Sequence, residues 1–357
     1  LKAGGTTSSD SELPFHAFTT DVPGGASDDS LVRVAWEGTT DPGARVRLLV
    51  WNTKANAYQE VDVALTDKET GEATLEAMVP LGEHAVDGEI RAVVQHSEGW
   101  AGPNLTGRDS AVEPYHPEDT PRSDYDFTFA WETDTQYYNE SFYDHQIAIH
   151  NYLLERREAL NLQYLFHTGD IVDKAEQQFQ WDNANKAYKM LDEAGFPYGV
   201  LAGNHDVGHM SNDFTEYSKN FGEDRYAHNP WYGGSYQNNR GHYDLITAGG
   251  HDFIMLYMGW APGDAEIEWM NEVLEAYPER TAIINLHEYM LTTGGLGPIP
   301  QRIYDEVITP NANVRAVMSG HYHDAYTRVD RFDDNGDGEA ERTVTQMLFD
   351  LSLIHIS

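Results

Sequence analysis

The stretch Phe166-His-Thr-Gly-Asp-Ile-Val-Asp173 completes a run of β-forming residues that begins at Gln163. Gly169 lets the backbone turn, and the turn places Asp170 and Asp173 on the loop beyond the strand. Open α/β sheets bind their ligands at the carboxyl ends of strands, where these side chains lie. The stretch therefore predicts a strand that ends in a functional site.

A second stretch, Leu201-Ala-Gly-Asn-His-Asp206, repeats this plan. The strand predicted over 198–202 ends at Gly203, and Asn204 and His205 follow it on the loop. A helix is predicted between the two strands from small and apolar residues at helical spacing, namely Ala184, Ala187, Tyr188, Leu191 and Ala194. A strand, a helix and a strand in this order predict a parallel βαβ pair.

Composition limits the classes of protein that the chain can belong to. At 357 residues and 40.2 kDa it exceeds one ordinary hydrophobic core, which predicts two domains. The net charge of −36 would repel phosphate backbones, so no nucleic-acid-binding surface is expected, and we interpret the charge as a solvated exterior. No apolar run approaches the length of a membrane span. Cysteine is absent, so carboxylate, amide and imidazole groups must hold any metal ion.

The strand pattern changes along the chain and predicts the domain organisation. Residues 1–12 are small and polar and predict a linker from an upstream domain of a longer protein. Residues 13–112 contain short strands between Pro-Gly, Asp-Pro-Gly and Glu-Thr-Gly turns, the pattern of an all-β sandwich of immunoglobulin or fibronectin type III kind. Residues 113–125 form a charged, proline-rich hinge, and residues 126–350 alternate strands with helices, as in an α/β domain.

Five predicted strands of the second domain end in side chains that bind metal ions well. These side chains are Asp134 with Gln136, Asp170, Asn204 with His205, His287, and His321 with His323. A single histidine at a strand end is commonly a hydrogen-bonded structural residue. Five such strand ends in one sheet converge on one edge, however, and together they predict a metal centre.

Three motifs, Gly169-Asp-Ile-Val-Asp173, Gly203-Asn-His-Asp206 and Gly320-His-Tyr-His323, resemble those of the calcineurin-like metallophosphoesterases. The resemblance covers about residues 126–350. It implies a four-layer α/β/β/α sandwich that holds two divalent metal ions, which are Mn, Zn or Fe. The ligands it implies are Asp170 as a bridge between the ions, Asp134, Gln136 and His323 at a first position, and Asn204, His287 and His321 at a second.

The chain departs from the family pattern at Gln136, where most members carry a histidine. A neutral amide oxygen is a weaker ligand than imidazole, so looser binding or a harder ion is expected at the first position. Purple acid phosphatases are a related alternative, because a front β-sandwich would also fit them. That family needs a tyrosine ligand to iron where this chain has Asp173.

The predicted chemistry follows from two ions beside Asp134 and Asp170, which would hold a phosphate group even on a chain of this net charge. A water that bridges ions about 3.5–4 Å apart becomes acidic enough to attack phosphorus as hydroxide. His205 is then the imidazole that can protonate the leaving oxygen, with Asp173 or Asp206 fixing its tautomer. The alternative for His205 is mere support of a metal ligand. We therefore predict hydrolysis of phosphomonoesters or phosphodiesters by a metal-bridging hydroxide, with His205 as general acid.

Two further polar segments are candidates for ligand binding. Arg240 and His242 are candidate substrate-binding residues, because guanidinium suits phosphate bidentately, and a salt bridge within the hairpin is the alternative for Arg240. Asp333-Asp-Asn-Gly-Asp-Gly338 begins like a calcium loop, but its twelfth position is Val344 and no helices flank it. We therefore expect a polar turn between two strands there.

A binding protein is the alternative from another functional class. In that case the phosphoesterase domain would have lost its activity, and the β-sandwich would bind an extracellular partner. The intact ligand set argues against this alternative. The appended sandwich, the leading linker and the lack of cysteine predict an extracellular or cell-surface location in a bacterium or archaeon.

The last seven residues, Leu351-Ser-Leu-Ile-His-Ile-Ser357, are predicted to be a non-native tail. Relatives in the family continue beyond this point with Asp-Tyr-Gln and a glycine-rich segment, whereas the match here stops after Asp350. Its first six residues are the in-frame translation of a transposon library adapter, CTGTCTCTTATACACATCT, whose last base can begin the codon of Ser357. A genuine last strand is the alternative, because the segment has acceptable β-propensity. Sequencing of the source locus distinguishes the two.

Overall fold

The computed structural model describes residues 2–3, 15–22, 26–28, 30, 31–40, 44–67, 69–86, 88–97, 100–101, 119–208 and 211–350. Contacts divide the chain into two compact units. The first comprises Leu1–Pro103 with Ile246–Gly250, and the second comprises Asn104–Leu245 with His251–Ser357. The seven residues of the predicted non-native tail, 351–357, lie outside the described residues.

The first unit is all-β apart from one helical turn, α1 (Leu81–His84), as the turn-rich sequence predicts. One sheet has the order β1 (Lys2–Ala3), β2 (Phe15–Asp21), β8 (Glu89–Ser97), β4 (Arg45–Asn52) and β5 (Ala57–Leu65), with β7 (Ala85–Val86) beside β8. The other sheet pairs β3 (Leu31–Thr39) with β6 (Glu72–Pro80). A two-residue strand, β9 (Trp100–Ala101), follows. Leu48 and Ile90 of the first sheet share one buried core with Leu75 of the second, which makes the unit a two-sheet sandwich.

Two features of the predicted linkers differ from the expectation. Lys2–Ala3 is not part of a free linker, because it pairs as β1 with Phe18 and Thr19 of β2. Within the predicted hinge, Arg122–Asp124 forms a 3₁₀ turn, η1, and the buried Arg122 guanidinium donates to the backbone carbonyls of Tyr125 and Asp126. These polar contacts fix the described part of the hinge in place.

The second unit contains two sheets. The smaller is parallel, with the order β10 (Thr128–Glu132), β11 (Leu162–His167) and β12 (Tyr198–Val200). The larger has the order β13 (Tyr232–Tyr236), β14 (Gly241–Ala248), β15 (His251–Met258), β16 (Thr281–Leu286), β17 (Val314–Ser319), β19 (Arg342–Leu348) and β18 (Tyr326–Phe332). Its central strands β15, β16, β17 and β19 run parallel, so their carboxyl ends share one edge.

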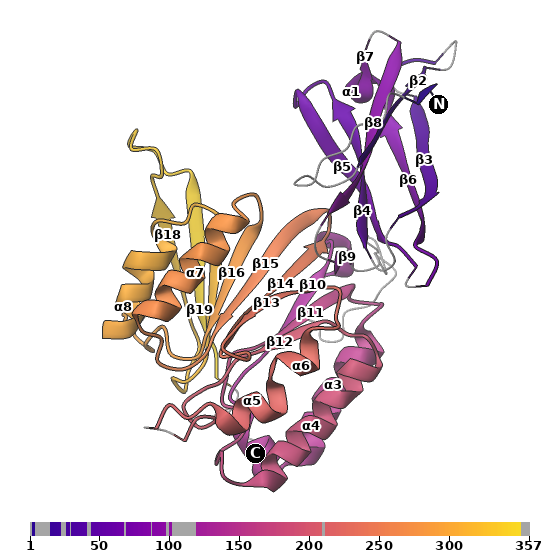
Figure 1. Ribbon diagram of the computed structural model, residues 1–357. Coiled ribbons are helices and arrows are strands. Elements are labelled where there is room, and N and C mark those ends of the chain that lie inside the picture. Colours follow the sequence, from indigo (N-terminus) through magenta and orange to yellow (C-terminus); the bar gives the residue numbers. More distant parts are fainter. Residues whose placement is uncertain are drawn as a thin grey trace. The chain divides into compact units, whose positions relative to one another are not determined.

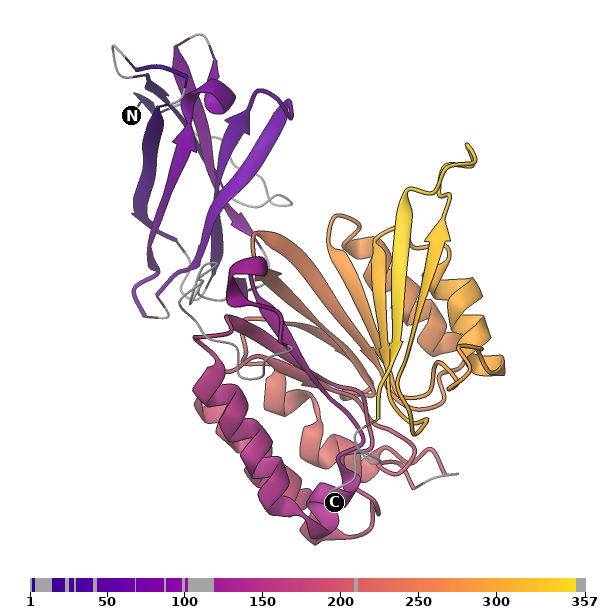
Figure 2. The same cartoon turned by 180° about the vertical axis from the view of Figure 1, so that it is seen from behind.

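Helices cover the outer faces of both sheets, and the two sheets face one another (Figures 1 and 2). α3 (Tyr143–Arg156) and α4 (Gln178–Glu193) pack on the small sheet, and α7 (Asp264–Ala276) and α8 (Pro298–Ile303) pack on the large one. The remaining helical elements are α2 (Gln136–Ser141), α5 (Thr215–Phe221), α6 (Glu223–Tyr226) and the π-helical turn η2 (Tyr304–Ile308). This is the four-layer α/β/β/α sandwich that the motifs imply.

Local sequence explains most of the element boundaries. Every residue of β11 is buried, because a helix layer covers one face of that strand and the second sheet covers the other. α3 ends at Arg156, since the Leu162 N–H donates to the Arg157 carbonyl and turns the chain into β11. At α7 the residue at the N-cap is Gly263, and the Glu266 carboxylate accepts the Gly263 N–H at 2.8 Å.

The acidic segment Asp333-Asp-Asn-Gly-Asp-Gly338 is a turn between the antiparallel strands β18 and β19, as predicted. Asp333 accepts backbone N–H groups of Gly336 and Gly338, and Asp334 pairs with Arg342 at 2.8 Å. These contacts explain why the segment forms a polar hairpin turn. Among the described residues, no helix is both long and apolar enough to cross a membrane.

A buried polar group lies in the aromatic layer between the two sheets. Asp244 of β14 accepts a hydrogen bond from the Tyr164 hydroxyl of β11, and Tyr257 of β15 donates to Tyr164 at 3.0 Å. All three side chains are almost fully buried. Burial raises the pKa of Asp244 well above its usual range, although the Tyr164 hydrogen bond opposes the shift. The folded protein therefore holds this proton more tightly than the unfolded chain does.

Asp244→Asn is expected to make the protein less sensitive to rising pH. The stabilising contribution of protonated Asp244 is complete below about pH 4 and is lost as the pH rises through the raised pKa, whereas asparagine has no proton to lose. The difference in free energy of unfolding, variant minus wild type, should therefore grow with pH. Urea unfolding of both proteins across a pH series measures it. A difference that does not change with pH would show that folding does not shift the pKa of Asp244.

Candidate metal centre

The predicted ligands follow strands of both sheets, at the edge where the parallel strands end. Asp134 follows β10, Asp170 follows β11, Asn204 follows β12, His287 follows β16 and His321 follows β17. Backbone hydrogen bonds join these loops, since Asp134 N–H donates to the Gly169 carbonyl at 2.9 Å and Gly320 N–H donates to the His287 carbonyl at 3.1 Å. The two sheets therefore bring five chain segments to one place.

Three of these residues adopt a backbone conformation that side chains disfavour. Asp134, Asp170 and His321 have φ values of 53°, 56° and 72°, in the left-handed region. Such residues cost about 1–3 kcal/mol each and cluster at functional sites. Gly203 allows a close approach at the same place, because a Cβ there would lie 2.1 Å from Asp170 Oδ1. The local backbone is thus shaped to position these side chains.

Asp170, His287 and His321 form a group of possible metal donors, each of which offers an atom within 4.8 Å of the others. His287 Nδ1 donates to the Thr168 carbonyl at 2.8 Å, which assigns the neutral ring a lone pair on Nε2. That Nε2 lies 3.1 Å from Asp170 Oδ2 and 3.1 Å from Asn204 Oδ1. Three lone-pair atoms therefore face one point, an arrangement that a cation stabilises.

The electrostatics of the buried carboxylates also call for a cation. Burial raises the pKa of Asp134 well above its usual range, and the charge of Asp170 adds to the shift. Burial lowers the pKa of His287, but the carboxylates of Asp170 and Asp134 outweigh it and raise the pKa to about 10. Burial and His287 lower the pKa of His321 to about 4, so its ring is a neutral donor. A divalent ion would take the place of the proton on His287, and the donor set fits one.

The predicted first position is more open. Asp134 is buried, and its two carboxylate oxygens accept the His321 N–H at 3.2 and 3.1 Å. Gln136 begins α2, is only 3% exposed, and its Oε1 has no hydrogen-bond partner among the described residues. A buried acceptor of this kind suits a metal ligand. The His323 side chain is 57% exposed and lies outside the group formed by Asp170, His287 and His321. Its Nε2 lies 3.7 Å from Asp350 Oδ2.

His205 is held beside this group and remains partly accessible to solvent. Its backbone N–H donates to Asp170 Oδ1 at 2.9 Å, and its Nε2 lies 3.9 Å from Asp170 Oδ2. The Nδ1 atom lies 2.8 Å from the Asp173 carbonyl and 3.2 Å from Asp173 Oδ1, so Asp173 orients the ring. Asp206, the alternative partner, instead accepts the N–H groups of Ile171, Val172 and Gly203 inside the loops. It holds the loops together rather than orienting His205.

The two predicted substrate-binding residues have other roles. His242 is 1% exposed and stacks on Tyr257 with ring centroids 4.3 Å apart, and burial lowers its pKa to about 3. This corrects the expectation of a phosphate contact, because a buried neutral ring reaches no ligand. Arg240 forms a 2.9 Å ion pair with Glu266 of α7 and lies over the Phe214 ring, so its salt bridge reaches a helix rather than staying within the hairpin.

Two residues near the site were not predicted from the sequence. Trp260 places its ring 5.8 Å from the His287 ring and 5.1 Å from the His321 ring. It follows β15 after one glycine, but a lone tryptophan carries no metal-ligand signal. Asp350 follows β19 at the same sheet edge, and the rule that located the other strand-end carboxylates would also have found it.

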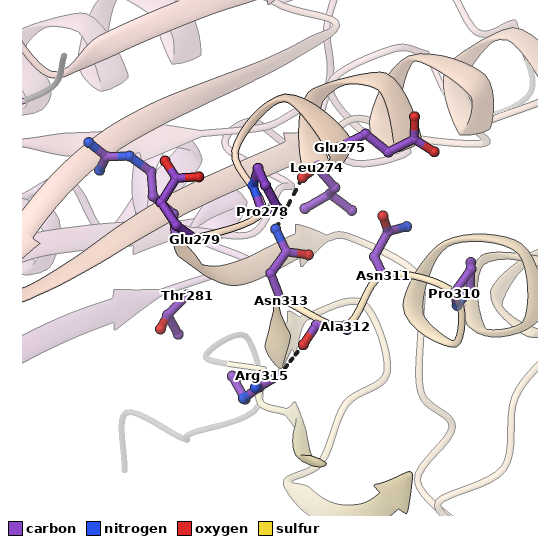
Figure 3. A pocket seen from close by; sticks show the side chains of 11 residues that line it. Leu274, Glu275, Pro278, Glu279, Thr281, Pro310, Asn311, Ala312, Asn313 and Arg315 are labelled. Carbon is purple, nitrogen blue, oxygen red and sulfur yellow. Dashed lines mark hydrogen bonds between the residues drawn. The ribbon is translucent and has the colours of Figure 1, made fainter. Parts of the chain in front are cut away.

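A pocket of about 360 Å³ lies at the opposite, amino end of β16 and β17 (Figure 3). Asn313 lines it and donates from Nδ2 to the carbonyls of Leu274 and Tyr277 at 3.1 and 3.0 Å. These hydrogen bonds join the end of α7 to the start of β17. The pocket is therefore a structural junction, separate from the candidate centre.

The four-layer fold and the clustered carboxylate, imidazole and amide donors suit a metal-binding protein. The chain belongs to the calcineurin-like phosphoesterase family, whose sequence model matches residues 127–325. It is 40% identical over 341 residues to an uncharacterized protein of Bacillus subtilis strain 168, YvnB. That match covers 95% of this chain, and the chain spans only 24% of the length of YvnB.

Two solved structures are also similar to this chain. One is a dimetal phosphatase from Danio rerio, at 12% identity and a TM-score of 0.44, covering 63% of this chain and 87% of that one. The other is the purple acid phosphatase PPD1 from yellow lupin, at 13% identity and a TM-score of 0.43, covering 90% of this chain and 63% of that one.

Proposed function

We propose that this chain hydrolyses phosphomonoesters or phosphodiesters with two divalent metal ions. The first would be held by Asp134, Gln136 and His323, the second by Asn204, His287 and His321, with Asp170 shared between them. The observation that carries the proposal is that Asp170 Oδ2 and Asn204 Oδ1 each lie 3.1 Å from His287 Nε2. Atoms that bind the same metal ion lie about this far apart. Divalent ions bound there would activate water near neutral pH and offset the charge of the phosphate.

The proposed role of His205 is to donate a proton from Nε2 to the leaving oxygen. Asp173 supports this role, because its carbonyl and its carboxylate both lie beside Nδ1 of His205 and can accept the hydrogen of that nitrogen. The other ring nitrogen, Nε2, then faces Asp170. A carboxylate on the far nitrogen also stabilises the protonated ring before proton transfer. The side chain is 20% exposed, which leaves it within reach of a bound ester.

Arg240 and His242 do not enter the proposed mechanism, because their side chains are already engaged elsewhere. The groups that would face a bound phosphate are His205, Trp260 and the exposed His323. The ions are proposed to be Mn, Zn or Fe. Gln136 offers an amide oxygen where an imidazole is usual, and this favours a harder ion such as Mn at the first position.

Metal analysis and a panel of chromogenic esters test the proposal. Purified protein should hold two divalent ions per chain and hydrolyse aryl phosphate monoesters, diesters or both. A parallel assay after dialysis against a chelator, with metal added back singly, identifies the ions that restore activity. A protein that hydrolyses no phosphoester with any of these metals would overturn the proposal.

Chelators are expected to abolish the activity, and the active protein is expected to be colourless. A purple acid phosphatase takes its colour from a tyrosinate bound to iron, whereas here Asp173 stands at that position and contacts His205. Absorption spectra of the metal-loaded protein, with assays before and after chelation, check both statements. A visible charge-transfer band would instead favour the purple acid phosphatase alternative.

An extracellular or cell-surface location also belongs to the proposal, and it rests on the all-β first unit and the absence of cysteine. The alternative, a binding protein that works through the sandwich, is disfavoured by the complete donor set at the second metal position. Fractionation of the source cells, with detection by an antibody against this chain, tests the location.

A further inference from the structure

The two imidazoles of the second metal position are oriented by different contacts. The His287 ring is fixed by a hydrogen bond, because its Nδ1 lies 2.8 Å from the Thr168 carbonyl. Within the part of the chain that the structure describes, the His321 ring has no such partner, and the hydrogen bonds of this residue run from its backbone N–H to Asp134. A metal-bound histidine ordinarily donates its other ring N–H to a fixed acceptor, which sets the orientation of the ring. Packing must therefore orient the His321 ring.

Aromatic side chains provide this packing. The rings of His287, Tyr322 and Trp260 lie beside the His321 ring, at centroid distances of 4.9, 4.7 and 5.1 Å. Tyr322 belongs to the same loop as His321, and His287 is itself a proposed ligand. Trp260 comes instead from the loop between β15 and α7, and its ring also lies 5.8 Å from the His287 ring. One indole therefore packs beside both imidazoles of the second position.

The backbone around Trp260 holds the indole at this place. The Trp260 N–H donates to the Ala202 carbonyl at 2.9 Å, and Ala202 lies two residues before Asn204 of the second position. The next residue, Ala261, has a φ of 53°, in the left-handed region that residues with side chains disfavour. Such strain persists where the surrounding structure requires it. Here it accompanies the turn that brings the indole to the two imidazoles.

We propose that Trp260 is a positioning residue of the second metal position, which holds the His321 imidazole by packing in the orientation that binds a metal ion. The inference rests on the proposed two-metal function. The indole takes the place of the hydrogen bond that usually orients a metal-bound histidine. Metal affinity at this position then depends on the presence of a ring at residue 260, so another aromatic side chain should serve and a small one should not.

Calorimetric titration of Mn²⁺ into the metal-free full chain tests the inference. Trp260→Ala should weaken one of the two binding steps by about 10–100-fold, the range typical for loss of a residue that orients a metal ligand, and should leave the other step unchanged. Trp260→Phe keeps a ring and should recover most of the affinity. Circular dichroism checks that the metal-free variants are folded. If the alanine variant is not, Trp260→Leu takes its place, because it keeps apolar burial without a ring and should weaken the same step.

Trp269→Ala is the matched control. Trp269 of α7 is also half-buried, but its ring packs against Tyr236, at a centroid distance of 5.4 Å, and not against a proposed ligand. This variant should bind both ions as the wild type does, whatever its effect on stability. Weakening of one binding step by Trp269→Ala as well would overturn the inference, because loss of any large ring would then be sufficient.

A double variant tests whether Trp260 acts through His321. His321→Asn keeps a weak amide ligand, so the affected binding step stays measurable, but its side chain is too short to need the indole. Trp260→Ala should cause little further loss of affinity in this background. A full further loss there overturns the inference, as does a Trp260→Ala protein that binds both ions normally or a Trp260→Phe protein as weak as Trp260→Ala. A wild type that binds no Mn²⁺, Zn²⁺ or Fe²⁺ would overturn the proposed function itself, and the inference with it.

Discussion

Replacing Asp170 with alanine is expected to remove metal binding and phosphoester hydrolysis together. Asp170 Oδ2 lies 3.1 Å from His287 Nε2, and the side chain is shared between both proposed positions. Its loss removes the carboxylate that lies beside His287 at the second position, and it weakens the first position as well. Metal content should fall from two ions per chain toward none, and turnover should fall to background. Metal analysis and a chromogenic ester assay on the same preparation measure both.

Asp182→Ala provides the matched control for Asp170→Ala. Asp182 is an exposed residue of α4 that only accepts a side-chain hydrogen bond from Gln178, so its loss should leave both metal content and turnover unchanged. Circular dichroism of the metal-free Asp170→Ala protein checks that it remains folded, because the variant removes one partner of the buried pair of Asp170 and His287. An Asp170→Ala protein that keeps two ions would contradict the shared-ligand assignment.

Replacing His205 with alanine is expected to separate metal binding from turnover. None of the proposed ligand atoms belongs to the His205 side chain, so the variant should keep both ions. General-acid assistance is typically worth about 10²–10⁴-fold, and turnover of esters with poor leaving groups should fall by that factor. Esters with good leaving groups need less protonation and should lose less. Steady-state kinetics with a series of aryl phosphates of graded leaving-group pKa measure the difference.

His228→Ala serves as the control for His205→Ala, because His228 is an exposed histidine that follows α6 and is not among the predicted site residues. It should retain wild-type rates over the whole series. A His205→Ala protein that turns over poor and good leaving groups equally well, at the wild-type rate, would show that the ring supports the site without donating a proton. Loss of metal in this variant would place His205 among the ligands instead.

Local sequence was sufficient for the strands and for most of the candidate ligands. β16 and β17 are recognisable as apolar runs of the sequence, because strands buried on both faces read as continuous apolar segments. The glycines at positions 169, 203 and 320 mark the turns after the strands, and the ligand-type side chains follow within a few residues. Strand, turn and side chain are adjacent in the chain, so this part of the site is determined by the sequence alone.

Tertiary structure decided what depends on contacts between distant segments. Side chains along β14 alternate between its two faces, so the sequence does not show whether the His242 ring is enclosed. The packing of Tyr257 and Tyr226 against that ring shows that it is. The choice of Asp173 over Asp206 as the partner of His205 depends on how two loops meet. The position of Asp350 at this sheet edge depends on the pairing of β19 with β17. Pairing order and burial arise from packing across the whole domain, and no short stretch of sequence contains them.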